Sequence, residues 1–103
     1  MAEEYSEVIM GLILHAGNAK SLAIDAYRKA RSGDFTQAED LLKQADEAMV
    51  EAHRLQTTMI QDEINGKSVP MTLLMVHAQD HTMTAMTVID LIKEMIITMK
   101  EGK

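Results

Sequence analysis

The chain has 103 residues, no cysteine and a formal net charge of −6, and 47% of its residues are hydrophobic. The lack of cysteine excludes disulfides, thiolate metal sites and cysteine nucleophiles. The negative charge disfavours binding to nucleic acid or to an anionic membrane surface. Length and apolar content favour one globular domain over residues 1–103, with no segment inserted in a membrane. Acidic residues near the N-terminus, where an export signal would be basic, favour a cytoplasmic location.

The first predicted helix runs from about Glu3 to Arg31. Its apolar and small residues recur every three or four positions, which is the spacing of a helix that packs one face against other helices. They are Val8, Ile9, Leu12, Ala16, Ala19, Leu22, Ala23, Ala26 and Ala30. Ser32 and Gly33 interrupt this pattern, so we expect the helix to end there.

A second helix is predicted to begin after Asp34, whose side chain can cap the first turn, with Gln37 as the reciprocal half of a capping box. Small and apolar residues again follow helical spacing. They are Ala38, Leu41, Ala45, Ala48, Ala52, Leu55 and Met59. The run Asn65-Gly66-Lys67-Ser68 is typical of a turn, and we expect the helix to end before it.

The third predicted helix has Pro70 at or near its first turn and extends to about Lys100. Apolar residues cover most of its circumference. They include Leu73, Leu74, Met75, Val76, Met83, Met86, Val88, Ile89, Leu91, Ile92, Met95, Ile96, Ile97 and Met99. Because two neighbouring helices cannot cover such a helix on all sides, we expect an antiparallel three-helix bundle that self-associates through this helix, as a threefold or fourfold assembly.

One stretch of the third helix, His77-Ala78-Gln79-Asp80-His81, carries two imidazoles, a carboxylate and an amide in apolar surroundings. At about 100° per residue, His77, Asp80 and His81 share one stripe with Thr84, whereas Gln79 lies roughly 200° round the helix from His77. Such groups are costly to bury unless they are paired. We therefore expect this stripe to have a chemical function.

Two kinds of chemistry fit the stripe. His77 and His81 are one turn apart, which is the spacing of a two-histidine metal site, and Asp80 could be a third ligand. Alternatively, one neutral imidazole is a nucleophile that accepts a phosphoryl group, with His81 and Gln79 as nearby hydrogen-bond donors. A purely structural oligomerisation module, with neither phosphate nor metal, is a third possibility.

Asp80 has two interpretations of its own. If it faces a symmetry axis, several copies of the carboxylate meet and must bind a hard cation such as magnesium or hold protons. Otherwise it forms a local hydrogen bond, for example with Thr84. The ten methionines could hold copper(I), but flexible thioethers that fill an interface explain them better.

The segment from Leu73 to Thr84, LLMVHAQDHTMT, resembles the signature of the IIA component of the lactose/cellobiose class of the bacterial phosphoenolpyruvate:sugar phosphotransferase system. The first helix resembles the same family. Its matching residues are Val8-Ile9-Met10-Gly11-Leu12-Ile13, then Gly17, Ala19, Ser21-Leu22, Ala30, Gly33 and Asp34-Phe35. The resemblance spans essentially the whole chain.

This resemblance implies a homotrimer of three-helix bundles that accepts a phosphoryl group from the phosphocarrier HPr and passes it to a cysteine of a cognate IIB protein or domain. The phosphorylated histidine of the family matches His77. The family's aspartate, which gathers with its symmetry mates around one magnesium ion inside the trimer, matches Asp80. His81 and Gln79 match the surroundings of the active site. Lactose, cellobiose, chitobiose and other β-glucosides all remain open as the sugar.

Overall fold

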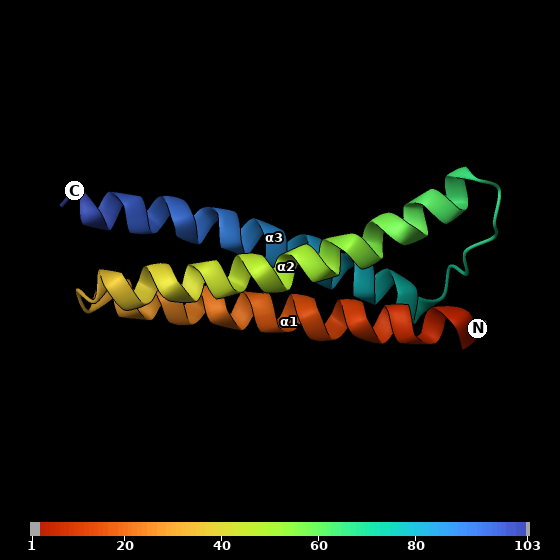
Figure 1. Ribbon diagram of the computed structural model, residues 1–103, viewed down its shortest axis with the longest axis horizontal. Coiled ribbons are helices and arrows are strands. Elements are labelled where there is room, and N and C mark those ends of the chain that lie inside the picture. The colour runs from red at the N-terminus through yellow and green to blue at the C-terminus, as the bar shows by residue number, and fades with distance from the viewer. Residues whose placement is uncertain (1–2, 103) are drawn as a thin grey trace.

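The computed structural model describes residues 3–102, with side chains from Tyr5 onward. The chain forms three long helices, α1 (Glu3–Arg31), α2 (Phe35–Ile64) and α3 (Leu73–Lys100), and no strand occurs in the described residues. Consecutive helices run in opposite directions along a bundle with extents of 50 × 20 × 20 Å (Figure 1). The predicted all-α fold of three helices is confirmed.

The turn between α1 and α2 is closed by backbone hydrogen bonds around Gly33, which has a φ of 91°. The Gly33 amide donates to the Ala30 carbonyl and the Asp34 amide donates to the Lys29 carbonyl, each at 2.9 Å. The Asp34 side chain accepts from the Gln37 amide at 3.1 Å, so the predicted cap is confirmed. The Asp34 amide donates to the Lys29 carbonyl at the end of α1 and not to the Gln37 side chain, so the reciprocal half of the capping box is not formed.

The connection between α2 and α3 is longer than predicted, because α3 begins at Leu73 and leaves Pro70 outside the helix. The residue that caps the start of α3 is Thr72, which has extended backbone angles. Its hydroxyl accepts from the Met75 amide at 3.1 Å. A side-chain cap, which the sequence analysis did not identify, therefore decides where this helix starts.

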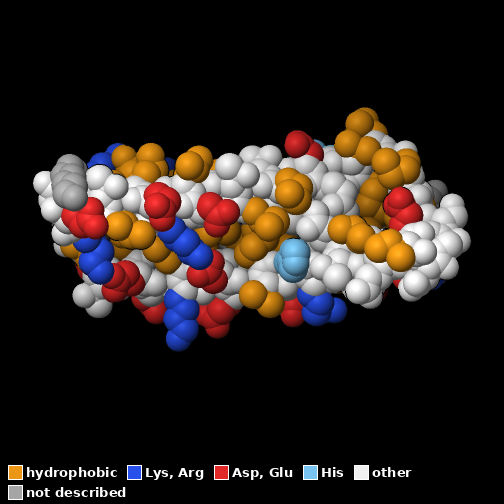
Figure 2. Space-filling view, turned by 90° about the horizontal axis from the view of Figure 1, so that it is seen from above, with side chains coloured by type: hydrophobic (Ala, Val, Ile, Leu, Met, Phe, Trp, Pro, Cys, Tyr) orange, Lys and Arg blue, Asp and Glu red, His pale blue; other side chains and the backbone are white. Residues whose placement is uncertain are grey.

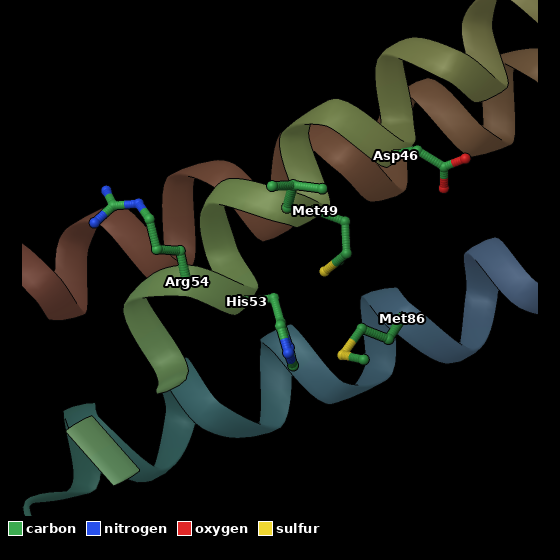
Figure 3. Close-up of a pocket in the computed structure, with 6 residues that line it drawn as sticks. Asp46, Met49, His53, Arg54 and Met86 are labelled. Atoms are coloured by element: carbon green, nitrogen blue, oxygen red, sulfur yellow. The ribbon is translucent and has the colours of Figure 1, made fainter. Parts of the chain in front are cut away.

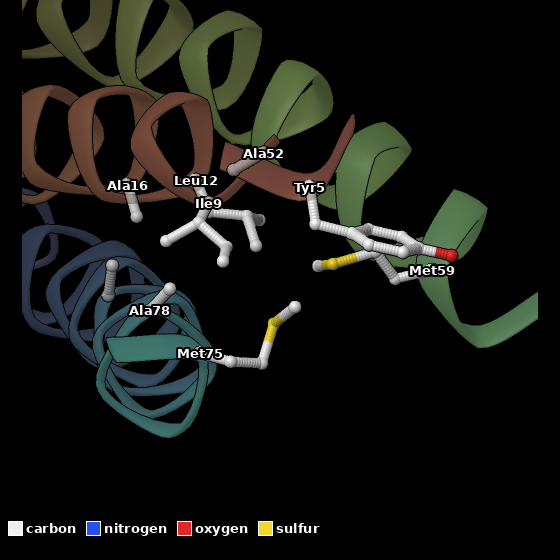
Figure 4. Close-up of a cluster of buried hydrophobic side chains, with 9 residues drawn as sticks. Tyr5, Ile9, Leu12, Ala16, Ala52, Met59, Met75 and Ala78 are labelled. Carbon is white, nitrogen blue, oxygen red and sulfur yellow. The ribbon is translucent and has the colours of Figure 1, made fainter. Parts of the chain in front are cut away.

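Helix α1 packs along both other helices, whereas α2 and α3 contact one another sparsely. Alanines make the close approach to α1 possible, because a methyl side chain separates two helix axes very little. The buried alanines of one half of the bundle are Ala19, Ala23, Ala26, Ala30, Ala38 and Ala45. In the other half, Tyr5, Ile9 and Leu12 of α1 meet Met59 of α2 and Met75 of α3 (Figure 4).

The outward face of α3 exposes large apolar side chains. They include Leu73, Val76, Met83, Leu91, Met95 and Ile97. Seen from one side, charged groups concentrate over the half that holds the α1–α2 turn, and the half that holds the α2–α3 connection is mostly apolar or uncharged (Figure 2). Within residues 3–102, none of the helices combines the length and apolarity needed to cross a bilayer.

Candidate functional site

His77 and His81 lie together in the first half of α3, as the sequence predicts. Their ring centroids are 6.0 Å apart and their planes differ by 10°. The His77 side chain is exposed, whereas His81 is half-buried. The His77 imidazole is therefore accessible to a partner molecule, while the His81 imidazole is partly covered.

The half-buried His81 lies against α1 at Gly17. A Cβ atom built on Gly17 would be only 3.2 Å from Nε2 of His81. The next residue along α3, Thr82, is completely buried, and its hydroxyl donates to the Ala78 carbonyl at 2.8 Å. The histidine pair thus lies on the α1 side of α3, where packing is close.

Gln79 points to the opposite side of α3. Its Oε1 accepts a hydrogen bond of 2.8 Å from Nε2 of Gln56 in α2. Within one chain, the structure therefore does not bring Gln79 to the two histidines, in agreement with its predicted place round the helix.

Gln56 itself was missed by the sequence analysis. It is only 7% exposed. The signal that could have found it is its spacing, because Gln56 falls one turn after Ala52 on the stripe that α2 buries.

Asp80 is exposed on the outward, apolar face of α3. No hydrogen bond or ion pair involves it in the described part of the chain, so a bond with Thr84 is not observed. In residues 3–102, no three side chains of the metal-binding types His, Cys, Asp and Glu gather closely enough to hold an ion. A metal held by Asp80 or by the histidine pair would need ligands other than the His, Cys, Asp and Glu side chains of the described residues.

A groove of about 530 Å³ separates α2 from α3 on the side away from the histidine pair. Met49 and His53 of α2 and Met86 of α3 point into it, whereas Arg54 turns away (Figure 3). The Arg54 guanidinium donates to Glu51 at 2.9 Å, and this bond and its charge lower the pKa of the Glu51 carboxyl. His53 is exposed and apart from the histidine pair.

Comparison with known proteins assigns a family to this arrangement. Residues 7–100 match the family described as "PTS system, Lactose/Cellobiose specific IIA subunit". The chain is 49% identical over 96 residues to the lichenan-specific phosphotransferase enzyme IIA component of Bacillus subtilis, which covers 93% of this chain and 87% of the relative.

Solved structures agree with the sequence match. The cellobiose-specific enzyme IIA from Bacillus anthracis superposes with a TM-score of 0.93 at 39% identity, covering 98% of this chain and 93% of the other. The chitobiose IIA protein of Escherichia coli, solved in complex with HPr, has a TM-score of 0.82 at 41% identity and covers 97% of both chains. Sequence and fold therefore lead to the same family.

Proposed function

This chain belongs to the lactose/cellobiose-specific IIA family of the sugar phosphotransferase system, and from that premise we propose that His77 carries the phosphoryl group. As a member of the family it is a phosphotransferase component. The observation that carries the assignment to His77 is its exposed imidazole, stacked on half-buried His81 in the motif of α3.

The chemistry needs one nitrogen lone pair. Neutral imidazole is a competent nucleophile near neutral pH, so a nitrogen of His77 forms a bond to phosphorus as the bond between phosphorus and the donor breaks. The resulting phosphoramidate keeps a high transfer potential. It is discharged when an acceptor thiolate forms a bond to phosphorus and the nitrogen–phosphorus bond breaks.

Phosphoryl transfer of this kind depends mainly on positioning and on hydrogen bonds to the phosphoryl oxygens. His81 is the nearest candidate donor, because its ring is stacked with that of His77. Gln79 bonds to Gln56 of its own chain on the opposite side of α3 from the histidine pair, so we propose that it shapes a neighbouring surface and does not contact the phosphoryl group.

The proposed donor is HPr and the proposed acceptor is a cysteine of a cognate IIB protein or domain. The similar chitobiose IIA protein of Escherichia coli forms a complex with HPr, which supports this choice of donor. Apolar side chains next to His77, among them Leu73 and Leu74 one turn earlier, offer a surface on which both partners can dock. We place this exchange in the cytoplasm.

For the sugar we propose a β-linked disaccharide. Similar proteins specific for lichenan, cellobiose and chitobiose support this choice, although another relative is specific for galactose. A IIA protein only hands the phosphoryl group on, so the identity of the sugar depends on the partner that discharges it.

We further propose a homotrimer assembled through α3. The outward face of α3 exposes more large apolar side chains than a monomer in water normally retains, which supports its burial against other copies. Asp80 lies in this face and has no partner in its own chain within residues 3–102. Three such carboxylates at a symmetry axis fit one magnesium ion, which prefers oxygen ligands and would offset their repulsion.

A phosphorylation assay tests the assignment of His77. The protein is incubated with radiolabelled phosphoenolpyruvate, HPr and the kinase that phosphorylates HPr. One phosphate should be incorporated per chain, stable in base and labile in acid. His77→Gln should abolish the label, and His53→Gln, which removes an exposed histidine from α2, should retain it. Label that survives in His77→Gln would refute the proposal.

Analytical ultracentrifugation tests the trimer. Asp80→Leu should retain or strengthen it, because a neutral apolar side chain relieves the repulsion at the axis, whereas Asp80→Lys should weaken it. A wild-type protein that sediments as a monomer at micromolar concentration would contradict the assembly, but not the chemistry of His77.

A further inference from the structure

We infer that Gly17 of α1 is a positioning residue, which lets the His81 imidazole lie against α1 and so sets its orientation beside His77. The consequence for phosphoryl transfer rests on the function proposed above. The packing that carries the inference is visible in a single chain.

The first observation is the tightness of the contact. A Cβ atom on Gly17 would lie 3.2 Å from Nε2 of His81, which is closer than an ordinary van der Waals contact between a methyl group and a ring. Gly17 is half-buried, so the ring lies over the α1 backbone where a side chain would otherwise stand.

The second observation excludes a backbone reason for glycine at this position. Positive φ angles occur at Gly33, Gly66 and Gly102 in the described residues, and Gly17 is not among them. Glycine in an ordinary helix interior is less favourable than alanine. From Ala16 to Ala30 the buried residues of α1 are all alanines, for example Ala16 and Ala19. Gly17 therefore leaves room for the His81 ring, and its backbone angles do not require glycine.

Gly11 shows what a glycine used only for packing looks like. A Cβ atom there would lie 2.8 Å from Cδ1 of Leu55, the far end of a flexible aliphatic side chain that can rotate away. At Gly17 the neighbouring group is instead the His81 ring, whose centroid is 6.0 Å from that of His77. A side chain at position 17 would push the imidazole away from α1 and change its geometry relative to His77.

This change should matter for transfer. A hydrogen-bond donor beside a phosphorylated imidazole must be placed to within a fraction of an ångström, and a misplacement of about 1 Å can cost roughly 100-fold in rate. His81 is the candidate donor to the phosphoryl oxygens in the function proposed above, and Gly17 acts through it.

The experiment measures the initial rate of phosphoryl transfer from phosphorylated HPr to the full-length protein. Gly17→Val should slow transfer by up to about 100-fold and Gly17→Ala by about threefold to tenfold. Gly11→Ala, the same kind of change on the same helix, should stay within about twofold of the wild type, because its neighbour is an aliphatic chain remote from the chemistry. Circular dichroism verifies that each variant is helical, and Gly17→Ala keeps the test valid if the valine variant fails to fold.

A double-mutant cycle separates positioning from general damage. In a His81→Ala background, Gly17→Val should change the rate by less than about twofold, because the ring that it displaces is gone. Nuclear Overhauser contacts between the Gly17 α-protons and the His81 ring should be strong in the wild type and lost in Gly17→Val.

Three results would overturn the inference: wild-type rates in both Gly17 variants, an equal loss with and without His81, or no Overhauser contact in the wild type. These results are distinct from failure of the proposed function, in which the wild type itself takes up no phosphate on His77.

Discussion

The two flanks of α3 are built differently. On the α1 side the helices pack closely, and the His81 ring lies over Gly17. On the α2 side the helices stand apart around an open groove (Figure 3). Longer polar side chains bridge that gap, through the Gln56–Gln79 hydrogen bond and the Lys93–Asp46 and Lys100–Glu39 ion pairs.

The difference shows how a bundle can hold one reactive group firmly and leave another surface free. A close-packed interior transmits any change in volume, so an imidazole that belongs to it has a defined orientation. Side chains that bridge a solvated gap can rearrange at little cost. His81 lies on the close-packed flank, where the phosphoryl transfer that we propose would gain most from fixed geometry.

The largest expected effect comes from the core that α1 shares with both other helices. Leu12 is completely buried, so Leu12→Ala should lower the free energy of unfolding by about 2–5 kcal/mol. Val50 lines the open groove and is 67% exposed. Val50→Ala should therefore change the free energy of unfolding by no more than about 0.5 kcal/mol. Urea denaturation at one protein concentration measures both. Equal losses would show that the core is no more closely packed than the side chains that line the groove.

The next effect concerns the neutral bridge across the open side. Gln56→Ala removes a nearly buried amide and its 2.8 Å bond to Gln79, at an expected cost of about 1–2 kcal/mol. Gln44→Ala is the matched control, because the Gln44 bond to Asp40 is exposed and should contribute less than about 0.5 kcal/mol. If both variants unfold at the same urea concentration, the Gln56 bridge does not support α3.

A smaller effect is expected from the ionic bridge. Nζ of Lys93 lies 2.8 Å from Oδ1 of Asp46, and both side chains are partly solvated. Lys93→Met should therefore lower the free energy of unfolding by no more than about 1 kcal/mol, and this difference should disappear in concentrated salt. Lys43→Met, at an exposed lysine of α2, serves as the control. A salt-independent loss at Lys93 would mean that packing of its aliphatic stem, and not charge, holds this end.

The smallest effect concerns the outer rim of the groove, where Arg54 lowers the pKa of the Glu51 carboxyl. Because the folded pKa lies below the unfolded one, this pair stabilises the fold above the unfolded pKa, and the contribution is lost as the pH falls through the folded pKa. Arg54→Met should raise the pKa of Glu51 toward its ordinary value, as measured by carboxyl carbon chemical shifts against pH. An unchanged titration would show that the pair does not persist in solution.

The end of α1, the Asp34 cap and the reach of α3 to Lys100 were predictable, because spacing and capping act within one or two turns of chain. Pro70 was predicted at or near the first turn of α3, but the helix begins at Leu73, where the Thr72 hydroxyl caps the first turn. The histidine motif was also found in the sequence, since its residues are neighbours along a single helix.

The amino-acid sequence by itself determined the three helices, the apolar face of each helix, and the stripe that bears His77, Asp80 and His81. Each of these depends on residues close together in the chain. Only the tertiary structure decided which flank of α3 closes and which stays open. That outcome depends on the volumes of side chains that meet from distant segments, as Gly17 meets His81 and Gln56 meets Gln79. A local sequence pattern does not predict such contacts, because neither residue of a contacting pair stands out within its own helix.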